Sequence, residues 1–132
     1  MSLVICHDGV KDELDQIQAQ SHNIGLFKNN HTPTPGDVLA DYTPADFGGY
    51  SGLVGLSGWS GASLSGDTAQ GDWTPVTWTA DGSGAGDVYG YYVVNNVTGK
   101  LAWAELNGAG PVTMNVNGQT FTVVPKRTHQ NV

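Results

Sequence analysis

The chain has 132 residues, enough for one domain, and is rich in turn-forming residues, with 19 glycines and 6 prolines. Its 4 tryptophans, 5 tyrosines and 3 phenylalanines supply the large side chains that a disordered chain lacks. The formal net charge is -7, from 12 acidic and 5 basic residues. This charge argues against a nucleic-acid-binding surface, because such a surface needs Lys and Arg to neutralise phosphates.

The N-terminal sequence "MSLVICHDG" lacks the basic region and the long apolar run of a signal peptide. Cys6 is the single cysteine, so no disulfide can form within the chain, and a reducing compartment is expected. No stretch approaches the roughly 20 apolar residues of a membrane-spanning helix. We therefore expect synthesis in a cytosol and no membrane partner.

One segment near the start has the apolar spacing of a helix, i, i+4 and i+7, at Val10, Leu14 and Ile17. Asp8 can cap its start, and Asn23 with Gly25 can end it. A helix of about 12 residues is marginal in isolation, so its apolar stripe must pack on something. Two environments are open, the sheet of the same domain, which is preferred, and a neighbouring subunit.

The sequence "PVTMNVNGQTFTVV" (111–124) predicts a β-hairpin, because Asn117-Gly118 separates two alternating runs. A two-residue turn there would place Val116 opposite Gln119 and Met114 opposite Phe121, and would also pair Val112 with Val123. The inward face would then hold Val112, Met114, Phe121 and Val123, and the outward face Thr113, Asn115, Thr120 and Thr122.

A second hairpin is predicted from "DVYGYYVV" (87–94) and "KLAWAEL" (100–106). A four-residue loop from Asn96 to Gly99 would pair Tyr92 with Trp103 and Val94 with Leu101. The segment 75–80, "PVTWTA", also alternates as a strand, and 24–28 has strand character. For the Gly- and Ser-rich middle we expect one strand at 50–59 and a flexible loop to Asp72.

This succession of short antiparallel strands predicts an all-β domain, an antiparallel β-sandwich or a jelly-roll-like barrel, with a short N-terminal helix and a long structured loop. The expected division is an N-terminal arm and helix at 1–23, the β-sandwich at 24–125 and a solvated tail at 126–132.

A search for catalytic or metal-binding motifs yields no candidate. Segment 58–62 lacks the helix that must follow a nucleophile elbow, and 82–87, "GSGAGD", lacks the glycine spacing and helix of a dinucleotide site. The aspartates between 67 and 87 fit no calcium loop and are favoured as turn caps. The histidines and Cys6 match no zinc spacing, and nothing points to Glu13 with Glu105 as an acid–base pair. No enzyme activity, metal or cofactor is expected.

The long connection after residue 28 contains a near repeat, Thr34-Pro35-Gly36-Asp37 and Thr43-Pro44-Ala45-Asp46. Each unit has Thr at a candidate N-cap, Pro at the first helical position and an acid two residues later, which predicts two capped helical turns. We expect Val38, Leu39 and Phe47 to point inward and anchor this connection, so that it is ordered.

The segments "LFKNNHTPTPGDVLADYTPADFGGY", "TPVTWTA", "VYGYYVVNNVTGKLAWAEL" and "GPVTMNVNGQTFTVVP" resemble a group of small β-rich virion proteins of tailed bacteriophages. The resemblance spans roughly Ile24 to Pro125, and its motifs are structural. It implies a capsid cement (decoration) protein or another minor virion component, made in the host bacterial cytoplasm and located in the virion. The implied partners are the major capsid protein and further copies of the chain, as a dimer or trimer.

For contacts with these partners we select residues of the helix face and the long connection: Val10, Leu14, Ile17, Phe27, Asn29, Asn30, Val38, Leu39 and Tyr42. Burial in the domain core is the alternative for each of them, and for Phe27 it is preferred. A second hypothesis is a carbohydrate-binding module of a phage tail, in which Trp59, Trp73, Trp78 or Tyr91 stacks on sugar rings.

Overall fold

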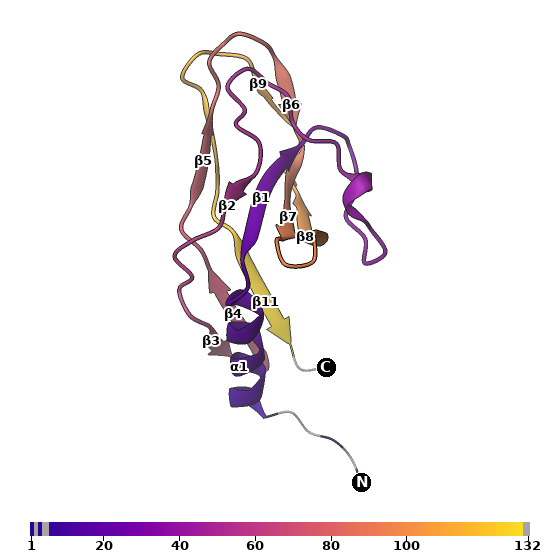
Figure 1. Ribbon diagram of the computed structural model, residues 1–132, viewed down its shortest axis with the longest axis vertical. Coiled ribbons are helices and arrows are strands. Elements are labelled where there is room, and N and C mark those ends of the chain that lie inside the picture. Colours follow the sequence, from indigo (N-terminus) through magenta and orange to yellow (C-terminus); the bar gives the residue numbers. More distant parts are fainter. Residues whose placement is uncertain (2, 4–5, 131–132) are drawn as a thin grey trace. The chain divides into compact units, whose positions relative to one another are not determined.

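The computed structural model describes residues 1, 3 and 6–130, and these are mostly β, with a single α-helix (Figure 1). The helical elements are α1 (His7–Gln18) and the 3-10 helix η1 (Leu39–Asp41). The strands are β1 (His22–Phe27), β2 (Val54–Gly55), β3 (Ser63–Ser65), β4 (Thr68–Asp72), β5 (Val76–Thr79), β6 (Gly86–Val88), β7 (Gly90–Asn95), β8 (Lys100–Leu106), β9 (Val112–Met114), β10 (Thr120–Val123) and β11 (Lys126–Gln130).

The prediction of a β-rich fold with one helix is confirmed, and the sheets are antiparallel and open. No helix in the described part of the chain is long and apolar enough to cross a membrane. The chain forms two compact units, unit 1 (residues 1–20, 57–75 and 124–132) and unit 2 (residues 21–56 and 76–123).

Unit 1 consists of α1 and a three-stranded sheet in the order β11-β4-β3. Val10 and Leu14, at 1% and 0% exposure, pack with Ala69 and the partly buried Trp59. Of the two environments open to the helix, it therefore occupies the one within its own chain. Residues 126–130, expected in a solvated tail, instead form β11 against β4.

Four local expectations, at the two ends of the helix and in the Gly- and Ser-rich middle, are wrong. The residue before the helix is Cys6, not Asp8, and the helix ends at Gln18 because Asn23 and Gly25 are already paired in β1. The supposed flexible loop up to Asp72 contains the hairpin β3–β4, and the strand expected at 50–59 is only the two-residue β2.

Asp15, on the polar side of α1, ties the helix to the segment before β3. Its Oδ1 accepts hydrogen bonds from Trp59 Nε1 at 3.0 Å and from the Ala62 amide at 2.8 Å. The bond from Trp59 is the main reason that the pKa of Asp15 lies below its ordinary value, and the Ala62 amide acts in the same direction.

We expect Asp15→Ala to lower the free energy of unfolding of unit 1 by about 1–2 kcal/mol, since bonds to a charged acceptor are strong but this carboxylate is partly exposed. Asp15→Asn, which keeps an acceptor oxygen, should lose less. Because the folded pKa is lowered, the wild-type advantage should be present above pH 3.8 and fall as the pH drops below it. Urea unfolding at several pH values measures both effects, and Asp12→Ala, an exposed site on α1, is the control. Equal losses in Asp15→Ala and Asp12→Ala would contradict this role.

Unit 2 is built around a four-stranded antiparallel sheet in the order β2-β1-β7-β8 (Figure 1). Both faces of this sheet are covered. One face packs against β5, β9 and β10 in a core that includes Ile24, Trp78, Val93 and Met114. The other packs against the connection after β1 through Phe27, Tyr42, Tyr92 and Val94. This two-sided burial explains why β7 has five consecutive buried residues rather than an alternating pattern.

The hairpin predicted for 111–124 is wrong in its pairing and right in its faces. β9 pairs with β6, β10 pairs with β5, and the described strands show no β9–β10 ladder. Gly118 still makes a tight turn with φ +85°, and the Gln119 amide donates to the Val116 carbonyl at 3.0 Å. The predicted inward residues Val112, Met114, Phe121 and Val123 all contribute to the core, and the four predicted outward residues are exposed.

The side chain of Gln119 takes the place of the missing ladder beside β9. Its Oε1 accepts from the amides of Asn115 and Val116 at 3.0 and 3.2 Å, and its Nε2 donates to the Thr113 carbonyl at 2.9 Å. One side chain therefore satisfies three backbone groups that a paired strand would otherwise have satisfied.

We expect Gln119→Leu to destabilise unit 2 by about 0.5–1.5 kcal/mol, because these exposed backbone groups exchange their side-chain partner for water. The reduction should be visible as a lower midpoint in chemical unfolding. Gln70→Leu, at an exposed position of β4, is the matched control and should leave the midpoint nearly unchanged. If both variants unfold at the same midpoint, the Gln119 side chain contributes nothing.

The second predicted hairpin is confirmed, with the predicted pairing next to its turn and a pairing shifted by one residue farther from the turn. β7 and β8 pair with Val94 opposite Leu101, as expected, across the four-residue connection. A register shift after Val93 then places Trp103 opposite Val93 instead of Tyr92. Ala102 is the additional residue, and such a bulge leaves no trace in the alternation of the sequence.

Candidate functional site

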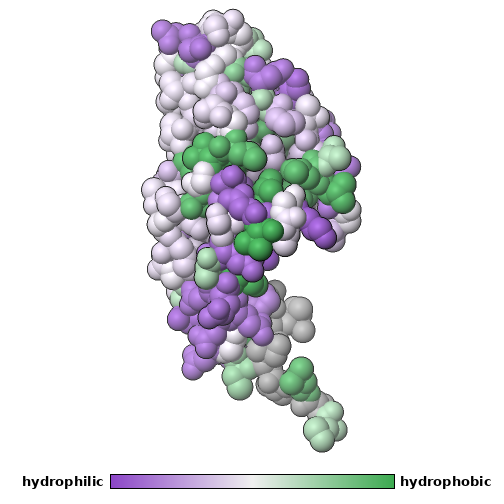
Figure 2. Space-filling view, viewed as in Figure 1, coloured by the Kyte–Doolittle hydropathy of each residue, from purple (hydrophilic) through white to green (hydrophobic). Residues whose placement is uncertain are grey.

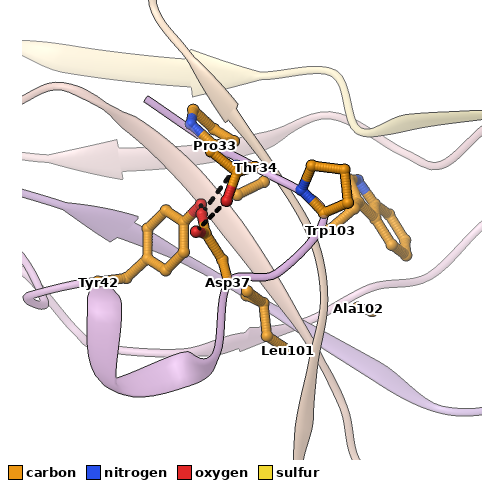
Figure 3. A pocket seen from close by; sticks show the side chains of 9 residues that line it. Pro33, Thr34, Asp37, Tyr42, Leu101, Ala102 and Trp103 are labelled. Atoms are coloured by element: carbon orange, nitrogen blue, oxygen red, sulfur yellow. Dashed lines mark hydrogen bonds between the residues drawn. The ribbon is translucent and has the colours of Figure 1, made fainter. Parts of the chain in front are cut away.

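The connection after β1, residues 28–44, is held together around one carboxylate, and we call this segment the Asp37 loop. Asp37 Oδ1 accepts a hydrogen bond from Thr34 Oγ1 at 2.6 Å. Asp37 Oδ2 accepts from the Thr34 amide at 3.0 Å and from the Tyr42 hydroxyl at 2.6 Å; Figure 3 shows these three residues together. The same oxygen accepts from His31 Nε2 at 2.8 Å. Four donors from three residues thus converge on a side chain that is only 7% exposed.

These donors hold the pKa of Asp37 well below its ordinary value of 3.8, and the Thr34 hydroxyl is the largest contribution, followed by Tyr42. An ionised carboxylate only accepts hydrogen bonds, so His31 Nε2 must carry its proton here. Burial and the Asp37 charge raise the pKa of Tyr42 in turn, and its hydroxyl remains a donor. The cluster is therefore a fixed anion with all its donors in place.

Asp41 repeats the same arrangement one turn later. Its Oδ2 accepts from the Val38 amide at 2.9 Å and closes the short helix η1. Asn29 braces the two ends of the loop, because its Nδ2 donates to the Asp41 carbonyl and its Oδ1 accepts from the Thr43 amide, both at 2.9 Å. The loop has no regular strand, but its hydrogen bonds keep it ordered.

The first predicted turn is confirmed and the second is wrong. The Asp37 amide bonds to the Thr34 carbonyl at 3.1 Å and closes a turn over Pro35-Gly36. Residues 43–46 form no turn, because Pro44 bridges Phe27 and the Ala45 amide donates to the Leu26 carbonyl. The segment extends the edge of β1 beyond the end of β2, and these bonds outweigh a local turn.

Of the anchors predicted for this connection, Phe47 is buried at 2% exposure, but Val38 and Leu39 point outward at 58% and 37%. Figure 2 shows this as hydrophobic surface, in green, on the loop that carries η1. The actual anchors are Phe27 and Tyr42, whose ring centroids lie 5.0 Å apart in an edge contact.

The residues selected for partner contacts therefore differ in what they can reach. Val10, Leu14, Phe27 and Tyr42 are at most 4% exposed, so the chain itself already covers their apolar atoms. Ile17 and Asn29 are half-buried. Only Asn30, Val38 and Leu39 are exposed. The three exposed residues of this set therefore all lie in the Asp37 loop.

A half-open groove of about 330 Å³ lies between the Asp37 loop and β8, and we call it the edge groove (Figure 3). The loop contributes Pro33, Thr34, Pro35, Asp37 and Tyr42, and β8 contributes its consecutive residues 101–104. Sequence analysis missed this groove, because it did not connect the loop with β8. The proline pair was the signal that could have indicated an apolar wall.

Three groups of the loop could in principle hold a metal ion, since His31, Asp37 and Asp41 offer ligand atoms within 4.8 Å of one another. In this structure the same atoms serve the loop itself. His31 Nε2 donates to Asp37, both Asp37 oxygens accept hydrogen bonds, and Asp41 Oδ2 accepts from an amide. An ion would have to replace these bonds, so the cluster functions as a structural lock.

The aromatic residues considered for sugar stacking do not form an accessible platform. Trp73, Trp78 and Tyr91 are 5%, 2% and 7% exposed. Trp59 is half-buried, with its ring 4.7 Å from that of Trp73 and its indole nitrogen bonded to Asp15. A sugar ring therefore has no open face on which to stack among these four.

The most distinctive surface of the described chain is thus the Asp37 loop, a rigid polar framework with an apolar tip beside the edge groove. Its hydrogen bonds hold the backbone that carries the exposed side chains of Val38 and Leu39. No protein-family model, curated protein or solved structure matches this chain.

Proposed function

We propose that this chain is a non-enzymatic structural protein of a tailed-bacteriophage virion, a capsid cement protein that binds and stabilises the shell of the major capsid protein. The observation that carries the proposal is the exposure of Val38 and Leu39 on a loop fixed by hydrogen bonds. Apolar side chains held in place before contact lose little entropy on binding, which favours a protein partner.

The sequence resemblance supports the same role, because its first motif contains the whole Asp37 loop. The proposal includes a β-sandwich or jelly-roll-like architecture for the β-rich part of the chain. The acidic net charge of -7 also suits a partner with a basic or neutral surface.

Two measurements test this function. Quantitative mass spectrometry of purified particles should find hundreds of copies per virion, whereas a handful would place the chain outside the shell coat. Shells assembled from the major capsid protein alone should bind the purified chain, and Val38→Asp with Leu39→Asp should weaken this binding at least tenfold, because charges at an apolar contact must be desolvated.

Val97→Asp is the matched control for the loop variant. Val97 is 70% exposed and lies in the turn between β7 and β8, outside the Asp37 loop. This variant should bind the shell as the wild type does. Equal affinity of the two variants would exclude the loop tip as the contact.

A further inference from the structure

The edge groove runs along a strand edge, and this follows from the faces on which its lining residues lie. Leu101 and Ala104 pack with the cluster of Phe27 and Tyr92, whereas Ala102 and Trp103 pack with the core on the opposite face of the sheet, so the groove is lined from both faces of β8. The feature that all four share is the backbone edge of β8. β8 is also the last strand of its sheet, and no other described strand pairs with its outer edge.

The opposite wall is not a strand that could pair with this edge. Pro33 and Pro35 have no amide hydrogen to donate, and the described part of the loop forms no ladder with β8. A strand edge that no neighbouring strand covers is a template for another extended segment. The groove therefore combines an uncovered strand edge with an apolar wall of two prolines and Leu101.

We propose that the edge groove of one copy binds the N-terminal segment of a second copy, residues 1–6, as an added strand beside β8. The segment has the matching chemistry, because "MSLVIC" carries no charged side chain and Leu3-Val4-Ile5 are residues that favour strands. Its described residues, Met1, Leu3 and Cys6, precede α1, which begins at His7, and Leu3 is 91% exposed.

The dimensions and the charges agree with this occupant. The six residues of the segment span about 20 Å when extended, and the four residues of β8 that line the groove span about 13 Å, so the segment is long enough to cover them. Asp37, the one charge on the groove wall, already has four hydrogen-bond donors, so the uncharged side chains of the segment meet no unpaired anion there. If each copy places its segment in the groove of the next copy around a rotation axis, the chains form a closed oligomer.

The native Cys6 allows a direct test, since it is exposed and is the single cysteine of the chain. Pro35→Cys places a second thiol on the wall of the groove, and mild oxidation should then link Cys6 of one copy to this introduced thiol of another. Non-reducing electrophoresis should show covalent oligomers that disappear in the Pro35→Cys, Cys6→Ser double variant. Val97→Cys, at an exposed position outside the groove, should form them at least tenfold more slowly.

Deletion of residues 2–5 provides the second measurement. Light scattering should show an oligomer for the full chain and a monomer for the deletion variant, with circular dichroism unchanged. A monomeric full chain, a disulfide confined to one chain, or equal cross-linking of Pro35→Cys and Val97→Cys would each overturn the proposal. Because these experiments use the purified chain alone, they succeed or fail independently of the virion function.

Discussion

Gly90→Ala should produce the largest loss of stability of any single methyl addition considered, about 3 kcal/mol or more in the free energy of unfolding of unit 2. Gly90 begins β7 and is paired on both sides, with Phe27 of β1 and with Leu106 of β8. A Cβ atom there would clash with the Glu105 carbonyl oxygen and would lie 2.8 Å from two carbons of the Phe27 ring. A backbone oxygen cannot move aside without disturbing the ladder, so the central sheet must distort.

Gly108→Ala is the matched control, because a Cβ atom there meets no other atom within 4 Å. This variant should change the free energy of unfolding by no more than about 0.5 kcal/mol. Equilibrium unfolding followed by tryptophan fluorescence measures both variants. Similar midpoints for the two alanine variants would show that the sheet tolerates the added methyl group, and the packing described for Gly90 would then be wrong.

Asp37→Asn should release the Asp37 loop while leaving the sheets folded. Asparagine has nearly the same shape, but its amide nitrogen cannot accept a hydrogen bond, and its neutral oxygen is a weaker acceptor than a carboxylate. The Thr34 hydroxyl, His31 and Tyr42 then compete for one oxygen. We expect amide hydrogen exchange in residues 31–41 to accelerate about tenfold or more, with protection of β1 and β7 unchanged.

The protection of the Asp37 loop from hydrogen exchange should decrease at low pH. The folded pKa of Asp37 is lowered, so its contribution is fully present above the ordinary value of 3.8 and is lost as the pH falls through the folded value. Exchange protection of the loop in the wild type should therefore persist from neutral pH to about pH 4 and decline below it. In Asp37→Asn this decline should be absent.

Asp46→Asn is the control for the Asp37 variant. Asp46 is an exposed carboxylate that pairs with Lys28 at 2.6 Å on the surface, where such pairs contribute little. Asp46→Asn should leave unchanged both the amide hydrogen exchange of the Asp37 loop and the binding to capsid shells that we propose. Asp37→Asn should weaken this binding, because the part of the loop that carries Val38 and Leu39 becomes mobile. If both variants behave alike, the loop does not depend on Asp37.

Only some of the hydrogen bonds of the Asp37 loop could be predicted from the sequence. Thr34, Pro35 and Asp37 were recognised as a capped turn, because every group that closes this turn lies within four residues. Local chemistry of this kind can be read from the chain. The contributions of His31 and Tyr42 were missed, since they reach Asp37 only after Tyr42 has packed against Phe27.

The exposure of Val38 and Leu39 was predicted wrongly for a related reason. An apolar pair in a short segment is ordinarily an anchor, but Phe27 and Tyr42 already cover that face of the sheet. Which apolar residues of the loop stay exposed depends on how much of the sheet face is left for them to cover. The area of that face is set by the packing of strands distant in the sequence, and the sequence of the loop does not reveal it.

The segment 111–124 shows the same limit most clearly. Its alternation correctly identified the residues that face the core, and Asn117-Gly118 correctly marked a turn. Both a hairpin and an arch between two sheets bury the same alternate side chains, so the pattern is identical for the two. Pairing of β9 with β6 and of β10 with β5 selects the arch, because a strand's partner is set by long-range backbone hydrogen bonds that side-chain periodicity does not encode.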